Sequence, residues 1–95
     1  MKSVEVVKRI TKVMEVSNIH GKGYILFVNG GLQFIHLGEA THCRIVHTIA
    51  TFNDDTKREY LDININGALL SFAGVNDLDF RGVFVTTVET ETKIY

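Results

Sequence analysis

Tyr60-Leu61-Asp62-Ile63-Asn64-Ile65-Asn66-Gly67-Ala68-Leu69-Leu70-Ser71-Phe72-Ala73 is the stretch that decides the fold. Asn66-Gly67 is the dipeptide preferred by a two-residue type I′ turn, because both central residues of that turn need φ > 0. A turn there places three apolar pairs on one face of a hairpin: Ile65 with Ala68, Ile63 with Leu70, and Leu61 with Phe72. The other face is mostly polar or small, and a slip of one residue would exchange the two faces. Turn chemistry and hydrophobic pattern therefore predict the same antiparallel hairpin.

The segments before and after this hairpin also favour strands. Thr41 to Phe52 holds too many β-branched residues for a helix, and Phe80 to Tyr95 is predicted to end the chain as one long strand. Tyr24–Val28 and Leu32–Leu37 flank the turn signal Asn29-Gly30-Gly31. A two-residue and a three-residue loop both give apolar cross-strand pairs there, so the register stays open. The remaining polar segments are predicted connectors: residues 18–23, 38–41, 53–57 and 74–79.

Residues 3–16 carry two competing patterns. Apolar side chains recur at helical spacing, with charged residues opposite them, which is typical of an amphipathic helix. Yet seven of the thirteen positions from 4 to 16 are β-branched, and such residues suit a pleated surface better. A bulge near Lys8-Arg9 would repair the strand alternation. The strand is the favoured interpretation, and the helix is kept as the alternative.

Together these patterns predict an all-β single domain over residues 1–95, because a chain of this length has no room for a second core. We expect six or seven antiparallel strands in a meander, a sandwich or a small barrel. The alternative is an α+β fold in which one N-terminal helix packs on an antiparallel sheet. The chain contains no proline, which is compatible with long uninterrupted strands.

Cysteine usage and hydropathy point to a cytoplasmic protein. The single cysteine, Cys43, cannot form an intrachain disulfide, which favours a reducing compartment. Met1 to Thr11 is charged and lacks the apolar region of a signal peptide. No apolar run approaches the length needed to cross a bilayer.

Three histidines and the cysteine are the residues that a zinc site or a nucleophilic site would use. His36, His42, Cys43 and His47 give the spacing H-x5-H-C-x3-H. Neighbouring residues of a strand point to opposite faces, and Cys43 and His47 would lie roughly 13 Å apart on an extended chain. Tetrahedral zinc sites need ligands that converge. We therefore predict no metal, no cofactor and no catalytic residue, and a buried structural thiol at Cys43.

The best small-ligand candidate is the loop His20-Gly21-Lys22-Gly23. Accessible amides beside a lysine can hold a phosphate, as a backbone nest does. Lys8, Arg9 and Lys12 would add to an anion site if they converge on this loop. The loop lacks the context of the known phosphate-binding motifs, so a plain hairpin connection is the competing interpretation.

These observations favour a non-enzymatic binding protein that acts as a regulator or inhibitor by protein–protein contact, of a kind often found in viruses. The alternative is a binder of a phosphate-bearing ligand, either a nucleotide or single-stranded nucleic acid, through the loop and the basic N-terminal segment. No membrane partner is expected. A homo-oligomer is predicted through Val83, Val85 and Thr87, because residues 83–88 are β-prone and carry no charge to protect a sheet edge.

Overall fold

The fold is all-β and antiparallel, as the sequence predicts. The computed structural model describes residues 4–19, 21–39 and 42–94, which contain eight strands and no helix. Residues 3–16, the ambiguous segment, contribute to a strand, so the helical alternative is wrong for the part described. The strands are β1 (Val6–Ser17), β2 (Tyr24–Val28), β3 (Leu32–His36), β4 (Cys43–Phe52), β5 (Lys57–Ile65), β6 (Ala68–Ala73), β7 (Asn76–Arg81) and β8 (Phe84–Lys93).

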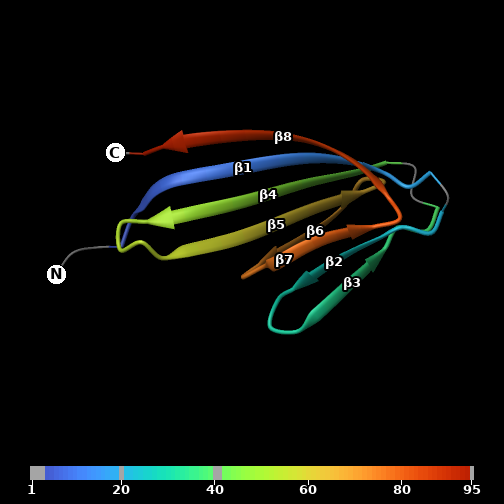
Figure 1. Ribbon diagram of the computed structural model, residues 1–95, viewed down its shortest axis with the longest axis horizontal. Coiled ribbons are helices and arrows are strands. Elements are labelled where there is room, and N and C mark those ends of the chain that lie inside the picture. Colours follow the sequence, from blue (N-terminus) through green and yellow to red (C-terminus); the bar gives the residue numbers. More distant parts are fainter. Residues whose placement is uncertain (1–3, 20, 40–41, 95) are drawn as a thin grey trace.

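Two sheets pack face to face. The five-stranded sheet, here sheet A, has the order β6-β5-β4-β1-β8, and the three-stranded sheet B has the order β3-β2-β7. Every neighbouring pair is antiparallel. Sheet B lies over one end of sheet A, whose long strands extend beyond it toward the two termini (Figure 1).

The β5–β6 hairpin has the predicted turn and register. Asn66 and Gly67 adopt φ values of 50° and 91°, as a type I′ turn requires. All three predicted apolar pairs are present in the ladder. Asn64 Oδ1 accepts a hydrogen bond of 2.9 Å from the Gly67 N–H, which closes the turn. In the β2–β3 hairpin, Val28 pairs with Leu32, so the three-residue loop is the one that forms.

β1 is an inner strand of sheet A and pairs with both β4 and β8. Its ladder with β4 shifts register between Val6 and Lys8, which confirms the irregularity predicted close to this point. Because β1 and β8 neighbour one another, the two ends of the chain do pair. The pairing does not close the sheet, since β8 and β6 remain at its two edges.

The last third of the chain differs from the prediction. The segment 74–79 was expected to be a connector and residues 80–95 a single strand; instead Asn76–Arg81 is β7 and Phe84–Lys93 is β8. Gly82 sits between them with φ 68°, a conformation that breaks an extended chain. β7 then joins β2 in sheet B, while β8 joins β1 in sheet A. The described residues therefore form eight strands rather than the six or seven expected.

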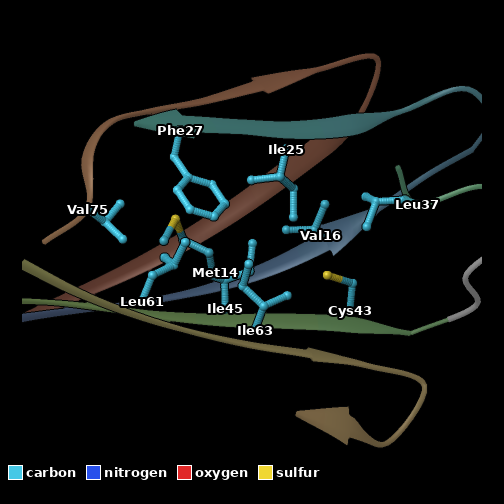
Figure 2. Close-up of a cluster of buried hydrophobic side chains, with 10 residues drawn as sticks. All are labelled: Met14, Val16, Ile25, Phe27, Leu37, Cys43, Ile45, Leu61, Ile63 and Val75. Carbon is cyan, nitrogen blue, oxygen red and sulfur yellow. The ribbon is translucent and has the colours of Figure 1, made fainter. Parts of the chain in front are cut away.

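The core lies between the two sheets and draws its side chains from both (Figure 2). Ile25 and Phe27 of β2 are fully buried and point toward sheet A. The Phe27 ring packs against Phe72 with centroids 4.9 Å apart and planes at 63°. The buried cluster consists of Met14, Val16, Ile25, Phe27, Leu37, Cys43, Ile45, Leu61, Ile63 and Val75. Hydrophobic burial by both sheets is thus what holds the two layers together.

The inner face of sheet A changes character where sheet B ends. Met14 and Val16 are buried, whereas Lys8 and Lys12 occupy the same face farther toward the start of β1. The matching positions of β8 carry Glu89, Glu91 and Lys93, which are all exposed. The uncovered end of this face therefore carries charged side chains, as a solvated surface should, around the half-buried pair Ile10 and Ile49.

Candidate functional site

The glycine-lysine loop joins β1 to β2 and is organised by Asn18. Of the loop residues predicted to hold an anion, His20 lies outside the described residues. Asn18 Oδ1 accepts hydrogen bonds from the backbone N–H groups of Lys22 at 3.1 Å and Gly23 at 2.9 Å. Its Nδ2 donates to the Gly38 carbonyl at 2.6 Å. Two amides that a nest would offer to a phosphate are therefore already bonded, and the loop presents the exposed Lys22 side chain instead.

The two glycines of this loop have different environments. Gly21 is exposed, and its φ of 67° suits a turn. Gly23 is buried where β2 begins, and a Cβ added to it would lie 2.1 Å from Val83 Cγ1 and 2.9 Å from the Gly82 carbonyl oxygen. Residues 82–83, just before β8, approach position 23 so closely that only glycine fits there. The role of Gly23 is therefore packing rather than ligand contact.

The basic residues of β1 do not gather at this loop. Lys8 and Lys12 lie on the inner face of sheet A and Arg9 on the outer face, because side chains alternate along a strand. Lys8 Nζ is 3.8 Å from Glu91 Oε1. The loop follows the opposite end of β1, after Ser17, roughly 15 Å along the strand from Lys12. The structure thus separates the two halves of the predicted anion site.

The residues predicted for self-association lie at or just before an edge strand, but all three of their side chains face inward. Val83 and Val85 pack against the hydrophobic core, and Thr87 lines a hollow on the inner face. Phe84 and Val88 are the exposed apolar residues of β8, each with 64% of its surface accessible. Side chains alternate between the two faces of a strand, so the inward-facing and the exposed residues of this segment can be told apart once the buried face is known.

The histidines and the cysteine considered for zinc lie in separate environments. His36 and His42 are exposed, whereas Cys43 and His47 are buried on β4. Within the described ranges no three His, Cys, Asp or Glu side chains come close enough to share a metal ion. Burial raises the pKa of the Cys43 thiol, and the charge of Glu15 raises it further. Cys43 is thus a protonated core residue and a poor nucleophile.

His47 is held by a carboxylate on the next strand. Its Nε2 lies 2.7 Å from Glu59 Oε2, so that the ring N–H donates to the carboxylate. A hollow of about 320 Å³ adjoins His47, and Leu78 and Phe80 of β7 line it. Lys12 and Glu89, which face one another in the β1–β8 register, also line it. The pair satisfies a polar side chain at the margin of the core, which is the usual arrangement for a buried histidine.

The most distinctive surface is the side of sheet B that faces away from sheet A, here called the sheet B outer face. Leu32 and Phe34 of β3 are exposed by 58% and 52%. Cross-strand pairing sets Val28 beside Leu32 and Leu26 beside Phe34. On β2 and β3 the face consists of Tyr24, Leu26, Val28, Leu32, Phe34 and His36, and Asp79 and Arg81 of β7 continue it. Sequence patterning identified these residues as strand residues, but only the packing of the opposite face shows that this side is left uncovered.

Three rings gather at one end of the sheet B outer face. The Tyr24 centroid is 5.9 Å from that of Phe34 and 5.8 Å from that of His36. Phe34 and His36 lie nearly parallel, with planes at 12° and centroids 6.5 Å apart. Arg81 is the partner of Tyr24 on β7 and forms an ion pair of 2.9 Å with Asp79. An aromatic and apolar surface with a neutralised charge pair at its margin is suited to contact with another molecule.

A second hollow, of about 620 Å³, lies along the outer face of sheet A. Arg9, Tyr60 and Asp62 bring charge and a phenol to it. Its complete lining is Val6, Arg9, Thr48, Ala50, Tyr60, Asp62, Ser71, Phe72 and Ala73. The mixture of groups does not select a ligand class.

In the part of the chain that the structure describes, no helix is long and apolar enough to cross a membrane. No family model matches this chain, and comparison with curated proteins and with solved structures found no match.

Proposed function

We propose that this chain is a small non-enzymatic binding protein that acts by protein–protein contact, as a regulator or inhibitor in a reducing compartment such as the cytoplasm. The observation that carries the proposal is the sheet B outer face, where Leu32 and Phe34 expose more than half of their surface beside further apolar side chains. Contiguous apolar surface of this kind is costly to leave in water and marks interaction sites. The single thiol, which is buried and free, fits a reducing environment.

The contact chemistry follows from the same face. β3 carries no aspartate, glutamate, lysine or arginine, and Arg81 on the neighbouring β7 strand is paired with Asp79. The partner should therefore present an apolar patch of its own rather than a strongly charged one. Phe34 is the expected anchor, because aromatic side chains near the centre of an interface contribute most to affinity.

Phe34→Glu is expected to abolish partner binding while leaving the fold intact, because it places a charge in the centre of the contact surface. The partner can be identified by affinity capture from an extract of the source cell. The immobilised proteins are wild type, Phe34→Glu and the control variant Leu69→Glu. Leu69 is 65% exposed on β6, in the other sheet, so its variant makes the same kind of change elsewhere. The partner is the protein retained by wild type and by Leu69→Glu but lost with Phe34→Glu.

The purified partner then provides the quantitative test. Titration calorimetry should show an affinity at least about thirtyfold weaker for Phe34→Glu than for wild type, as expected for an interface hot spot. Circular dichroism of both variants verifies the fold. A partner that binds Phe34→Glu as tightly as wild type would remove the sheet B outer face from the proposal.

A second candidate is a nucleotide or single-stranded nucleic acid. The observation that favours it is the cluster of Tyr24, Phe34 and His36 rings. This cluster lies at the start of β2, and Lys22 precedes that strand by two residues. Bases stack on aromatic side chains, and a nearby ammonium group can meet a phosphate. This candidate differs from the sequence expectation, because the rings replace the basic residues of β1 as the companions of Lys22.

Fluorescence anisotropy with a labelled oligonucleotide and a labelled nucleotide tests this candidate. Lys22→Glu and Phe34→Ala should each weaken binding, whereas Lys8→Glu should not, since Lys8 lies at the far end of β1 beside Glu91. Lys8→Glu is the matched control because it makes the same charge change. Absence of binding by wild type, or equal losses in all three variants, would contradict the candidate.

A further inference from the structure

β8 is an edge strand whose outward-facing backbone groups can be identified. Its ladder with β1 runs without a register shift from Lys8–Lys93 to Ser17–Phe84. The Ile94 N–H donates to the Val7 carbonyl at 2.8 Å, and in an antiparallel ladder every second residue points to the same neighbour. Even-numbered residues of β8 therefore bond to β1. The residues whose N–H and C=O groups point away from sheet A are Val85, Thr87, Glu89, Glu91 and Lys93.

The first half of this edge lacks the usual protection against pairing with another strand. Residues 84–88 carry no charge and no proline, and both Phe84 and Val88 expose 64% of their surface on the outer face. Natural sheet edges are normally protected by charges, by proline or by being short. The opposite edge, β6, is short, with six residues, and its last carbonyl, that of Ala73, accepts a hydrogen bond from the Asn29 side chain.

We propose that β8 pairs antiparallel with β8 of a second copy of this chain, across a two-fold axis perpendicular to sheet A. The two five-stranded sheets would then join into one sheet of ten strands. A two-fold axis is the commonest symmetry of homo-oligomers and places the same edge on both sides of the interface. The contact is separate from the sheet B outer face, so it is independent of the partner proposed above.

Charge selects the register of this pairing. Residues that pair across the interface must lie on the same face of the sheet. The possible registers of the two β8 strands are therefore those that set odd-numbered residues opposite odd-numbered residues. A two-fold axis at Glu89 would set this residue against its own copy, and an axis at Thr90 would set Glu89 against Glu91. Like charges directly opposite one another are destabilising. An axis at Val88 is the longest overlap that avoids both arrangements.

With the axis at Val88, each carboxylate meets an uncharged residue. Glu89 lies opposite Thr87 of the second copy, and Glu91 lies opposite its Val85. On the outer face Val88 meets its own copy, so two exposed apolar side chains cover one another. Pairing over residues 85–91 forms about eight backbone hydrogen bonds, within the range of a stable interface. Val83 and Val85 keep their side chains in the core; Val85 and Thr87 contribute backbone groups.

Gel filtration with light scattering tests the assembly. Wild type at micromolar concentration should elute at about 21 kDa, twice the chain mass of 10.7 kDa. Thr87→Pro should give a monomer, because it removes an N–H that points away from β1 and spares the β1–β8 ladder. Val88→Lys and Val88→Glu should each give a monomer, since each sets a charge against its own copy. An equimolar mixture of these two variants should return to about 21 kDa.

The control is Leu69→Lys, which adds a charge to the other edge of sheet A and should leave the dimer intact. Urea unfolding of each variant shows that a monomer is folded. A wild-type mass of 10.7 kDa over the whole concentration range would overturn the proposal. A dimer that persists in Thr87→Pro would also overturn the proposal, because the contact would then lie away from β8. Dissociation of the dimer by Leu69→Lys would overturn it for the same reason. A lysine–glutamate mixture that stays monomeric would overturn the Val88 register.

Discussion

Phe27→Ala is expected to lower the free energy of unfolding by about 3–5 kcal/mol, the range for truncating a buried aromatic side chain. Phe27 is fully buried on β2 and packs against Phe72 from the opposite sheet. Truncation would remove one of the buried contacts between the two layers and leave a cavity in the core between them. Against a total stability of about 5–15 kcal/mol, a loss of this size leaves a marginal fold.

Urea denaturation followed by circular dichroism measures this effect. Phe34→Ala is the matched control, because Phe34 lies in the same small sheet but is 52% exposed on the outer face. Its loss should be about 1 kcal/mol or less, since an exposed position leaves no cavity. Equal losses in the two variants would show that Phe27 does not occupy the interface between the sheets.

Gly23→Ala is expected to cost about 1–3 kcal/mol, the usual range for overpacking a well-packed site. The added methyl group would lie 2.1 Å from Val83 Cγ1 and 2.9 Å from the Gly82 carbonyl oxygen. A valine side chain branches at Cβ and cannot swing away without leaving its rotamer, and the carbonyl belongs to the backbone. The chain segments before β2 and before β8 would have to separate.

Gly31→Ala is the control for this substitution. Nothing lies within 4 Å of the Cβ position at Gly31, and its φ is not in the left-handed region. Its stability in urea should stay within about 0.5 kcal/mol of wild type. If Gly23→Ala proved as well tolerated as Gly31→Ala, the close packing of residues 22–23 against residues 82–83 would be contradicted.

The candidate surfaces followed from the sequence only in part. The sequence shows that residues 83–88 carry no charge, and it leaves open which of the two end segments lies at a sheet edge; the structure places β8 there and β1 inside the sheet. The exposed residues of this segment could not be identified from the sequence, because Val83 and Val85 turn toward a core formed by strands far away in the chain. Likewise the glycines of the loop suggested open amides, whereas the Asn18 side chain occupies two of them.

The sequence by itself determined the local features. Asn66-Gly67 specifies its turn because few residues tolerate φ > 0, and strict alternation around it sets the hairpin register. Only the tertiary structure decided how the eight strands divide between two sheets, and that Gly82 sends β7 to one sheet and β8 to the other. Such choices depend on contacts between distant residues that compete for the same core. Those contacts leave the sheet B outer face uncovered and place β8 at an edge.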